Sequence, residues 1–238
     1  MKKQPLSEFS NARVLVAPSM LASDFSALGM ELQRIEDASA DIVHLDVMDA
    51  HFVPNLTIGP ALIASLRKHS RLPFDVHLMM TNPLKYIKAF ADAGADNITF
   101  HIECDDPVTK VISAIRAAGC SVGITMKPGT PASSIQKVVS KVNMVLIMTV
   151  EPGFGGQSFM QQTVSKITEV RRMLNASNPK AHVEVDGGID ESNANEVVAA
   201  GANVLVAGTS VFKHQNGIAA AIEQLHATQK QLNTGITG

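Results

Sequence analysis

Polar side chains that can bind a metal or carry a proton stand inside stretches that otherwise have the composition of buried strands. His44 and Asp46 lie in "IVHLDVMDAHFVPN", His77 lies in "FDVHLMM", and Asp186 ends "HVEVD". A buried charge costs free energy unless a partner compensates for it. Two imidazoles and two carboxylates suit a divalent transition metal and can leave open positions for substrate oxygens. These four residues are therefore predicted metal ligands.

A repeated unit of strand and helix must bring these residues together. Eight runs rich in β-branched residues recur along the chain, and a segment with helical period follows each one. The runs are "RVLVAP" from Arg13, "DIVHLDV" from Asp41, "FDVHLM" from Phe74, "DNITFHI" from Asp96, "CSVGITM" from Cys120, "NMVLIMT" from Asn143, "HVEVD" from His182 and "NVLVAG" from Asn203. Eight alternating units predict a closed (β/α)8 TIM barrel. The alternative is an open doubly wound sheet, but "SMLASDF" after the first strand lacks the glycines that such a sheet usually has there.

Two kinds of residue mark the ends of the predicted helices. Three pairs combine a capping side chain with a proline suited to the first helical position: Asn82-Pro83, Asp106-Pro107 and Thr130-Pro131. Glycines suited to the end of a helix precede three strands: Gly94, Gly119 and Gly201. Ser39 takes the same place before an earlier strand. No linker divides the chain, so residues 1–238 are predicted to form one domain, with loosely ordered termini at about 1–12 and 231–238.

The carboxyl ends of the strands are the expected place for chemistry, because catalytic groups of such barrels collect there. Residues two apart in a strand share a face, so His44 and Asp46 are expected to point together into the barrel mouth. A single histidine in a strand is more often a hydrogen-bonded core residue. Four candidates at one predicted rim favour the metal site instead.

Three further polar residues have structural interpretations. His101 also ends a strand, and we expect it to support the site or the fold without contacting substrate. Glu184 lies one layer deeper than Asp186 and is predicted to form hydrogen bonds in the core. His182 is expected in a loop or at the surface.

Glycine-containing loops follow the last three strands. "DGGID" from Asp186 and "AGTS" from Ala207 contain neither Lys nor Arg, so we predict that backbone N–H groups hold a phosphate there. A plain turn is the alternative for the first loop alone. "EPGFGGQ" from Glu151 is predicted to be a lid that excludes water, with Phe154 closing over the substrate.

Composition limits the classes of function. The net charge is −2 and no basic run occurs, which argues against a nucleic-acid partner. No apolar run reaches the length of a membrane span, and the two cysteines fit a reducing compartment. We therefore expect a cytoplasmic protein without a membrane partner.

Taken together, the motifs resemble the ribulose-phosphate 3-epimerase family in the same order from about Val14 to Phe212. They are "APSMLASDF", "HLDVMDAHFVPN", "FDVHLMM", "MTVEPGFGGQSFM" and "VEVDGGI". The resemblance implies a TIM barrel of the phosphate-binding, ribulose-phosphate-binding type. It also implies interconversion of D-ribulose 5-phosphate and D-xylulose 5-phosphate in the pentose phosphate pathway, by proton transfer at C3 between two carboxylates.

The resemblance also implies roles for individual residues. Asp46 and Asp186 match the acid/base pair, and His44, Asp46, His77 and Asp186 match the ligands of one divalent ion per subunit, zinc first, with Fe, Mn or Co as alternatives. The matching substrate-binding residues are Ser19, His77, Gly153, Phe154, Gly155, Gly156, Asp186, Gly187, Gly188, Gly208 and Thr209. Met48, Met79 and Met148 match the floor under the reacting carbon. The partner is a small sugar phosphate, and a homo-oligomer, dimeric or hexameric, is expected.

Some departures and alternatives stay open. Ala50 stands where the family usually has Gly, which would shift the local backbone if that position has a positive φ. An allulose-6-phosphate 3-epimerase or an inactive sugar-phosphate-binding barrel would share most of these motifs. A decarboxylase or aldolase would need a catalytic lysine, and Lys127, the single lysine at a strand end, stands in the turn-like "KPGTP".

Overall fold

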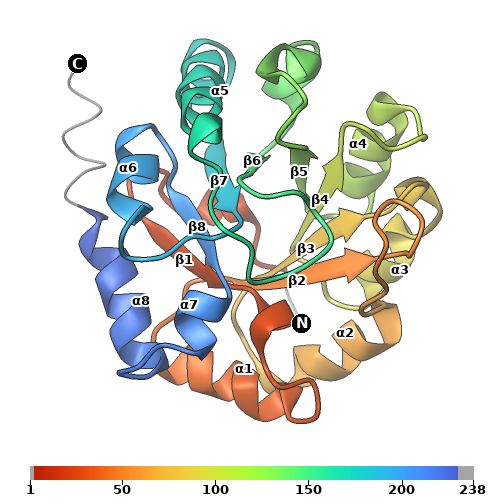
Figure 1. The fold of residues 1–238 in the computed structure, drawn as a ribbon. Helices are drawn as coiled ribbons and strands as arrows, with labels where there is room; N and C mark the ends of the chain where they lie inside the picture. The colour runs from red at the N-terminus through yellow and green to blue at the C-terminus, as the bar shows by residue number, and fades with distance from the viewer. Residues whose placement is uncertain (1–2, 230–238) are drawn as a thin grey trace.

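A computed structural model describes residues 3–229 as a barrel of eight parallel strands, as the sequence predicts (Figure 1). The strands are β1 Leu15–Pro18, β2 Val43–Met48, β3 Phe74–Met79, β4 Asn97–His101, β5 Ser121–Met126, β6 Met144–Met148, β7 His182–Asp186 and β8 Val204–Ala207. Each strand coincides with one of the eight predicted runs.

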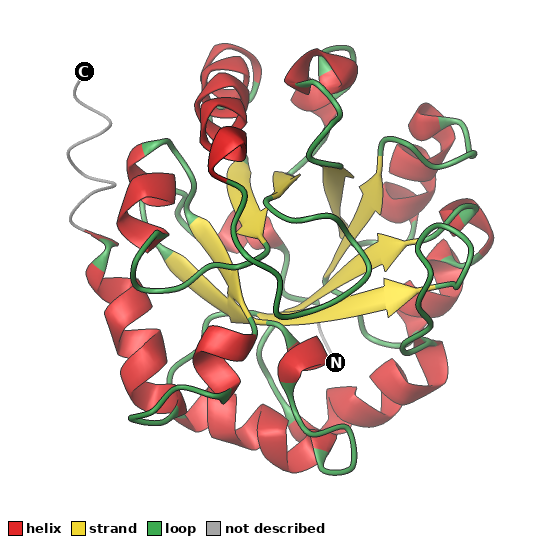
Figure 2. Ribbon diagram, viewed as in Figure 1, coloured by secondary structure: helices red, strands yellow, loops and turns green. Residues whose placement is uncertain are grey.

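Helices cover the outside of the strands, and loops cross the open end of the barrel (Figure 2). The α-helices are α1 Leu28–Asp37, α2 Pro60–Leu66, α3 Ile87–Asp92, α4 Val108–Ala117, α5 Val164–Ser177, α6 Ala194–Ala199, α7 Thr209–Phe212 and α8 Ile218–Ala227. Short 3-10 turns lie at η1 Leu6–Glu8, η2 Met20–Ala22, η3 Arg67–His69, η4 Pro83–Lys85, η5 Ala132–Ile135, η6 Val139–Lys141 and η7 Gln161–Thr163. No helix within residues 3–229 has both the length and the apolar character that crossing a membrane requires.

The sheet runs in the order β1-β8-β7-β6-β5-β4-β3-β2, which leaves β1 and β2 to meet at a seam. Backbone N–H groups of Asp41 and Ile42 donate to Val16 O across this seam, at 3.0 and 3.3 Å. A parallel bridge between Ser19 and His44 continues it toward the carboxyl ends. The barrel is thereby nearly closed, which brings strands far apart in the sequence around one central space.

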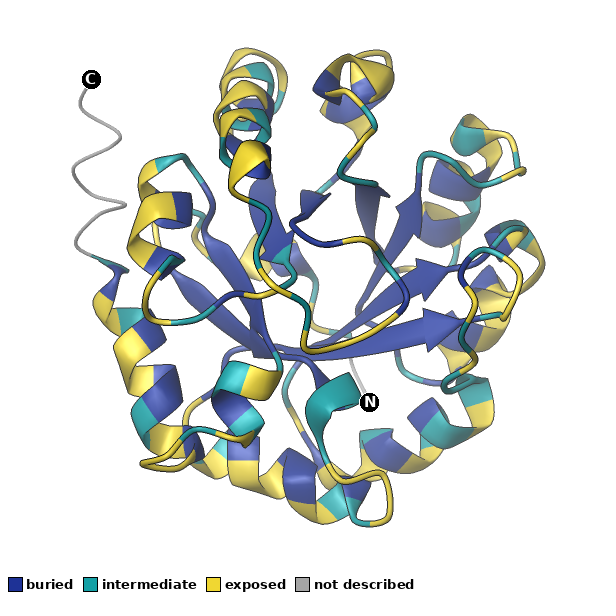
Figure 3. Cartoon of the chain, viewed as in Figure 1, coloured by how far each residue is buried: buried dark blue, intermediate teal, exposed yellow. Residues whose placement is uncertain are grey.

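The core has two parts, one between the strands and the helices and one inside the barrel, because successive side chains of a strand point to opposite faces. One face of each strand packs against the helices in a continuous aliphatic layer that includes Leu45, Val76 and Ile98. The strands are buried while the outer helix faces are exposed (Figure 3). Inside the barrel a smaller apolar cluster fills the amino end, with Leu6, Leu15, Ala17, Ile42, Met144, Val204 and Val206. Polar groups are left to occupy the interior at the carboxyl ends.

The segment before β1 contacts the amino end of the barrel through Leu6. The side chain of Leu6 is fully buried in the apolar cluster at the amino end of the barrel. Its backbone N–H donates to Ser121 Oγ at 3.0 Å, and its carbonyl accepts from His182 Nε2 at 3.1 Å. His182 is itself buried, contrary to its predicted surface position, because it anchors this segment. The predicted loose terminus at 231–238 lies outside the described residues.

The helix-end glycines are confirmed, and Asn82-Pro83 begins a helical turn as predicted, but none of the three predicted capping side chains forms a cap hydrogen bond. Gly94, Gly119 and Gly201 have φ values of 108°, 77° and 116°, and Ser39 has 64°. Asp106, however, accepts from Leu84 N at 2.8 Å instead of capping its own helix. Asn82 makes no cap hydrogen bond with its side chain, and Thr130 donates to Glu103. Partners from neighbouring loops outcompete the local ones.

Candidate metal centre and active site

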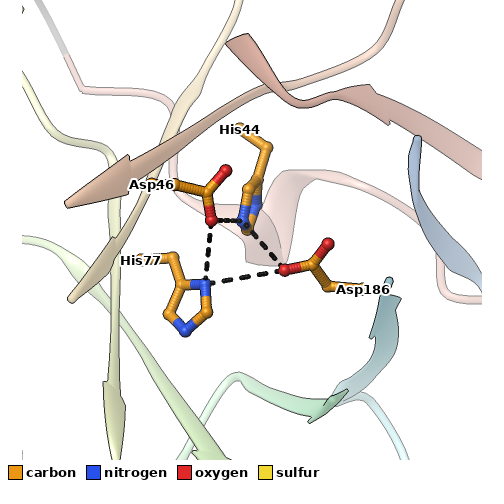
Figure 4. A group of neighbouring side chains, drawn as sticks. All are labelled: His44, Asp46, His77 and Asp186. Carbon is orange, nitrogen blue, oxygen red and sulfur yellow. Dashed lines mark ion pairs between the residues drawn. The ribbon is translucent and has the colours of Figure 1, made fainter. Parts of the chain in front are cut away.

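Four side chains meet at the carboxyl ends of β2, β3 and β7. One ligand atom from each of His44, Asp46, His77 and Asp186 lies within 4.8 Å of the others (Figure 4). Asp46 Oδ1 is 3.4 Å from His44 Nε2 and 3.3 Å from His77 Nδ1, and Asp186 Oδ2 is 3.8 and 3.7 Å from the same nitrogens. The structure therefore brings together the four residues that the sequence predicts as a group.

The donor set fits a divalent metal. Both histidines are fully buried, and within residues 3–229 neither His44 Nε2 nor His77 Nδ1 has a hydrogen-bond partner. Leaving a buried nitrogen without a partner costs free energy, which a cation bound between the four atoms would recover. Two imidazoles and two carboxylates are ligands that such an ion accepts.

A buried hydrogen-bond network contacts the ring nitrogen of His44 that does not face the cluster. Its Nδ1 lies 2.7 Å from Asp75 Oδ2, so the ring turns its other nitrogen toward the cluster. Asp75 Oδ1 in turn accepts from Asn97 Nδ2 and Thr99 Oγ1. Burial lowers the pKa of His44, but the carboxylates of Asp46 and Asp75 outweigh it and leave the pKa well above its ordinary value. A site that attracts a proton this strongly also attracts a metal ion.

The two aspartates differ in their affinity for protons. Burial raises the pKa of Asp46, but the imidazoles of His44 and His77 outweigh this effect and hold the pKa well below its ordinary value. Ser19 Oγ also donates to Asp46 Oδ2 at 2.6 Å, which favours the ionised form. Burial, reinforced by the charge of Asp46, raises the pKa of Asp186 to about 6. The two carboxyl groups therefore differ in proton affinity, which is the pattern that paired acid/base chemistry uses.

A cavity of about 570 Å³ opens above the two aspartates. All but one of the predicted substrate residues line it: Ser19, Gly153, Phe154, Gly155, Gly156, Asp186, Gly187, Gly188, Gly208 and Thr209. The predicted floor residues Met48, Met79 and Met148 line it as well. His77 is fully buried and outside the lining, so substrate contact by His77 stays a prediction.

Two glycine loops form one end of the cavity. Gly187 and Gly188 have φ values of 123° and 66°, and a Cβ at position 188 would lie 2.5 Å from Phe159 N. Ser210 Oγ donates to Ile189 O at 2.6 Å and ties the loop after β7 to the loop after β8. The closely packed backbone leaves no room for a side chain at Gly187 or Gly188.

The predicted lid, residues 153–156, lies over the same cavity. Asn55 Nδ2 donates to Gly153 O at 2.8 Å, which connects the lid to the loop after β2. Gln157 Nε2 donates to the carbonyls of Glu151 and Phe154, closing the loop on itself. Phe154 is 56% exposed and lines the cavity.

The structure also bears on the expectations for Glu184 and Lys127. Glu184 is fully buried, but neither of its carboxylate oxygens has a hydrogen-bond partner within residues 3–229, so its predicted core hydrogen bonds are wrong. Burial raises its pKa well above the ordinary value, which favours the neutral acid. Lys127 Nζ lies 4.2 Å from the centre of the Phe52 ring and outside the cavity lining, which disfavours a lysine-based mechanism.

Several residues that hold the site through hydrogen bonds are not predicted from the sequence. Asp75 shares a face with His77, so strand alternation alone could have identified it. Asn55, Glu103 and Ser210 act from loops or short helices, where no periodicity shows which way a side chain points.

Fold and site define a class: a (β/α)8 barrel with a metal-binding donor set at the floor of a glycine-lined cavity. The sequence model of the ribulose-phosphate 3 epimerase family matches residues 15–212. Ribulose-phosphate 3-epimerase from Rhodobacter capsulatus is 47% identical over 200 residues, covering 84% of this chain and 86% of that protein. The Bacillus subtilis (strain 168) enzyme of the same name is 46% identical, covering 84% and 92%.

The chain therefore belongs to the ribulose-phosphate 3-epimerase family. Among solved structures, 3-hexulose-6-phosphate synthase from Salmonella typhimurium matches with a TM-score of 0.66 and 18% identity, covering 92% of this chain and 99% of that chain. A likeness at that identity concerns the barrel fold alone.

Proposed function

We propose that the protein interconverts D-ribulose 5-phosphate and D-xylulose 5-phosphate, as its relatives' name implies, and serves the pentose phosphate pathway. The observation that carries the proposal is the meeting of Asp46 and Asp186 with two histidines at the floor of the cavity. The proton to be removed is on C3, beside the C2 ketone. Inversion at C3 requires removal from one face and return to the other, and therefore two groups.

Asp46 is the proposed base for ribulose 5-phosphate, because its environment keeps it ionised. Asp186 is the proposed acid, because its raised pKa lets it carry a proton near neutral pH. The two come from β2 and β7 and therefore approach the cavity from different sides. In the reverse direction the roles exchange.

His44, Asp46, His77 and Asp186 are the proposed ligands of one divalent ion, with zinc preferred and iron, manganese or cobalt as alternatives. When bound, such an ion would stabilise the negative charge that develops on the substrate oxygens. The backbone of Gly187, Gly188, Gly208 and Thr209 is proposed to hold the phosphate, and the lid to exclude water.

Solvent-deuterium exchange tests the proposed chemistry. In D2O the protein should convert ribulose 5-phosphate to xylulose 5-phosphate with deuterium at C3. Asp46→Asn and Asp186→Asn should each lower turnover on the order of 10²-fold or more, because each removes one proton-transfer group. Asp24→Asn, at an exposed carboxylate, is the matched control and should keep full turnover. Near-parental turnover by either active-site variant would exclude the two-base scheme.

Elemental analysis of protein purified without added metal should find about one divalent ion per chain. Exhaustive chelation should abolish turnover, and zinc should restore it. Faster turnover of allulose 6-phosphate than of ribulose 5-phosphate would assign the six-carbon substrate instead. Absence of C3 exchange despite sugar-phosphate binding would identify an inactive barrel.

We also propose that residues 1–238 act as one domain in a cytoplasmic homo-oligomer, a dimer or a hexamer. Sedimentation velocity at micromolar concentration would give the mass of the assembly. A monomer at that concentration would contradict the oligomeric part of the proposal.

A further inference from the structure

The second ring nitrogen of His77 has a partner that the reaction does not use. His77 Nδ1 faces the four-residue cluster, and the other nitrogen points away from it (Figure 4). That nitrogen, Nε2, lies 2.9 Å from His101 Nε2. Two imidazole nitrogens at this distance share one proton, so one must donate and the other accept.

The cluster fixes which nitrogen donates. A metal ligand must offer an unprotonated nitrogen, so Nδ1 of His77 is bare and its proton is on Nε2. His101 Nε2 must then accept, which places the proton of His101 on Nδ1. That nitrogen lies 3.3 Å from Glu103 Oε2, a group that can only accept when ionised. The proton position on His77 therefore determines the proton position on His101, which in turn requires an acceptor at Glu103.

Glu103 is held by the turn after β5. Its Oε1 accepts from the backbone N–H of Lys127 at 2.9 Å and from Thr130 Oγ1. The two oxygens of the carboxylate thus divide their roles, one binding the turn and the other facing His101. The "KPGT" turn contributes no group to the cavity lining. Its role in this arrangement is to hold Glu103, the last residue of the hydrogen-bonded series that begins at His77.

The two histidines of this hydrogen-bonded series are shielded from water. His77 and His101 are both fully buried and stack with 5.1 Å between ring centroids. The centroid of the Phe52 ring lies 4.6 Å from that of His101, and Lys127 Nζ lies over the Phe52 ring, 4.2 Å from its centroid. Water therefore cannot replace His101 as the partner of His77 Nε2.

We propose that His101 and Glu103 form a positioning relay for His77: Glu103 fixes the tautomer of His101, and His101 fixes the tautomer and ring orientation of His77 for metal binding. The proposal rests on the metal site of the proposed function. His44 shows the contrast, because its Nδ1 contacts the carboxylate of Asp75 directly, at 2.7 Å. The two histidines of one site thus reach their supporting carboxylates by different routes.

Metal affinity tests the relay without reference to turnover. His101→Leu removes the acceptor, and His101→Gln retains an oxygen that can accept from His77 Nε2. Competition with a chromogenic chelator should show zinc binding weakened about 10- to 100-fold in His101→Leu, as loss of such a supporting partner typically does. His101→Gln should stay within a few-fold of the parent. Thr125→Val, a buried change at the register partner of His101 on β5, is the control and should bind zinc like the parent.

Nitrogen-15 NMR of the histidine side chains provides a second readout that needs no variant to fold. In the zinc-loaded parent, His77 should carry its proton on Nε2 and His101 on Nδ1. The opposite tautomer of His101 would overturn the relay, as would parental zinc affinity in a folded His101→Leu protein. A parent chain that binds no divalent metal would overturn the proposed metal site and the relay with it, whereas a relay failure alone would leave the metal site standing.

Discussion

At the scale of single residues, environment decides what identical side chains can do. Asp46 and Asp186 are both aspartates at strand ends, yet two imidazoles beside Asp46 lower its pKa, while desolvation, reinforced by the charge of Asp46, raises the pKa of Asp186 to about 6. The two carboxyl groups therefore differ in proton affinity because their surroundings differ, which is the general pattern of paired carboxylates and the basis of the proposed acid and base roles. Burial, reinforced by the charge of Asp75, likewise raises the pKa of Glu184 well above its ordinary value.

Ala50 is a residue whose type disagrees with its backbone. It has a φ of 60°, in the left-handed region that favours glycine. The resemblance to the family suggests the same, because the family usually has Gly at this position. Relief of about 1–2 kcal/mol of steric strain would be partly offset by the greater backbone freedom of glycine in the unfolded chain, about 0.5–1 kcal/mol. Ala50→Gly should therefore raise the free energy of unfolding by up to about 1.5 kcal/mol.

Urea denaturation of both proteins measures the difference. Ala61→Gly, at an exposed position inside α2, is the control and should lower stability by about 0.5–1 kcal/mol. A stability loss in Ala50→Gly as large as in the control would show that the local backbone is not strained.

The sequence identifies the four clustered residues on the strands and the glycine loops that line the cavity, but it misses loop residues that act through one side-chain hydrogen bond. Alternation with a period of two tells which face His44, Asp46, His77 and Asp186 share, and that face proves to be the barrel interior. Glu103 carries no such signal, because its role depends on a turn that is 24 residues away in the chain.

At the scale of elements, strands are predictable and helix caps are not. Runs of β-branched residues define all eight strands, since burial on both faces requires apolar side chains throughout. Caps depend on competition between local and distant partners. Asp106 lies before α4 but accepts from Leu84 N, a contact that only the folded chain reveals.

The lid and the loop after β2 form a pair of elements joined by one side chain. Asn55→Ala removes the hydrogen bond to Gly153 O and should lower kcat/KM about 2- to 10-fold, the equivalent of about 0.5–1.5 kcal/mol for one hydrogen bond. Limited proteolysis within 153–157 should become faster, because the lid loses its anchor. Steady-state kinetics on ribulose 5-phosphate measures the first effect.

Asn195→Ala, at an exposed position of α6, is the control for the loss of an asparagine side chain. It should leave both the kinetics and the cleavage rate unchanged. Parental kinetics in Asn55→Ala would mean that closure of the lid does not depend on this contact.

At the scale of the whole molecule, the barrel interior is divided between two tasks. The amino end is filled by an apolar cluster that Leu6 completes from outside the barrel, and the carboxyl end holds the four candidate metal ligands. Stability and chemistry are thereby concentrated at opposite ends of the same strands, as in barrel enzymes generally. The sequence predicts the chemical end and misses Leu6, because one leucine in a polar segment has no periodicity.

The closure of the amino end should depend on pH through His182. Its Nε2 donates to Leu6 O and its Nδ1 accepts from Asn203 Nδ2, a combination open only to the neutral ring. Burial, with the nearby charge of Arg171, lowers its pKa in the folded state below the value of about 6.5 in the unfolded chain. The contribution to stability is therefore complete above about pH 6.5 and declines as the pH falls toward the folded-state pKa.

Urea denaturation at pH 7.5 and pH 5.5 tests this dependence in the parent and in His182→Gln. Other groups also titrate over this range, so the comparison rests on the difference between the two proteins. The parent should lose more stability on acidification than the variant, because glutamine has no proton to gain. Equal losses would show that His182 does not govern the closure. Hydrogen exchange at the Leu6 amide, faster at pH 5.5 than its intrinsic pH dependence predicts, would locate the effect in the segment before β1.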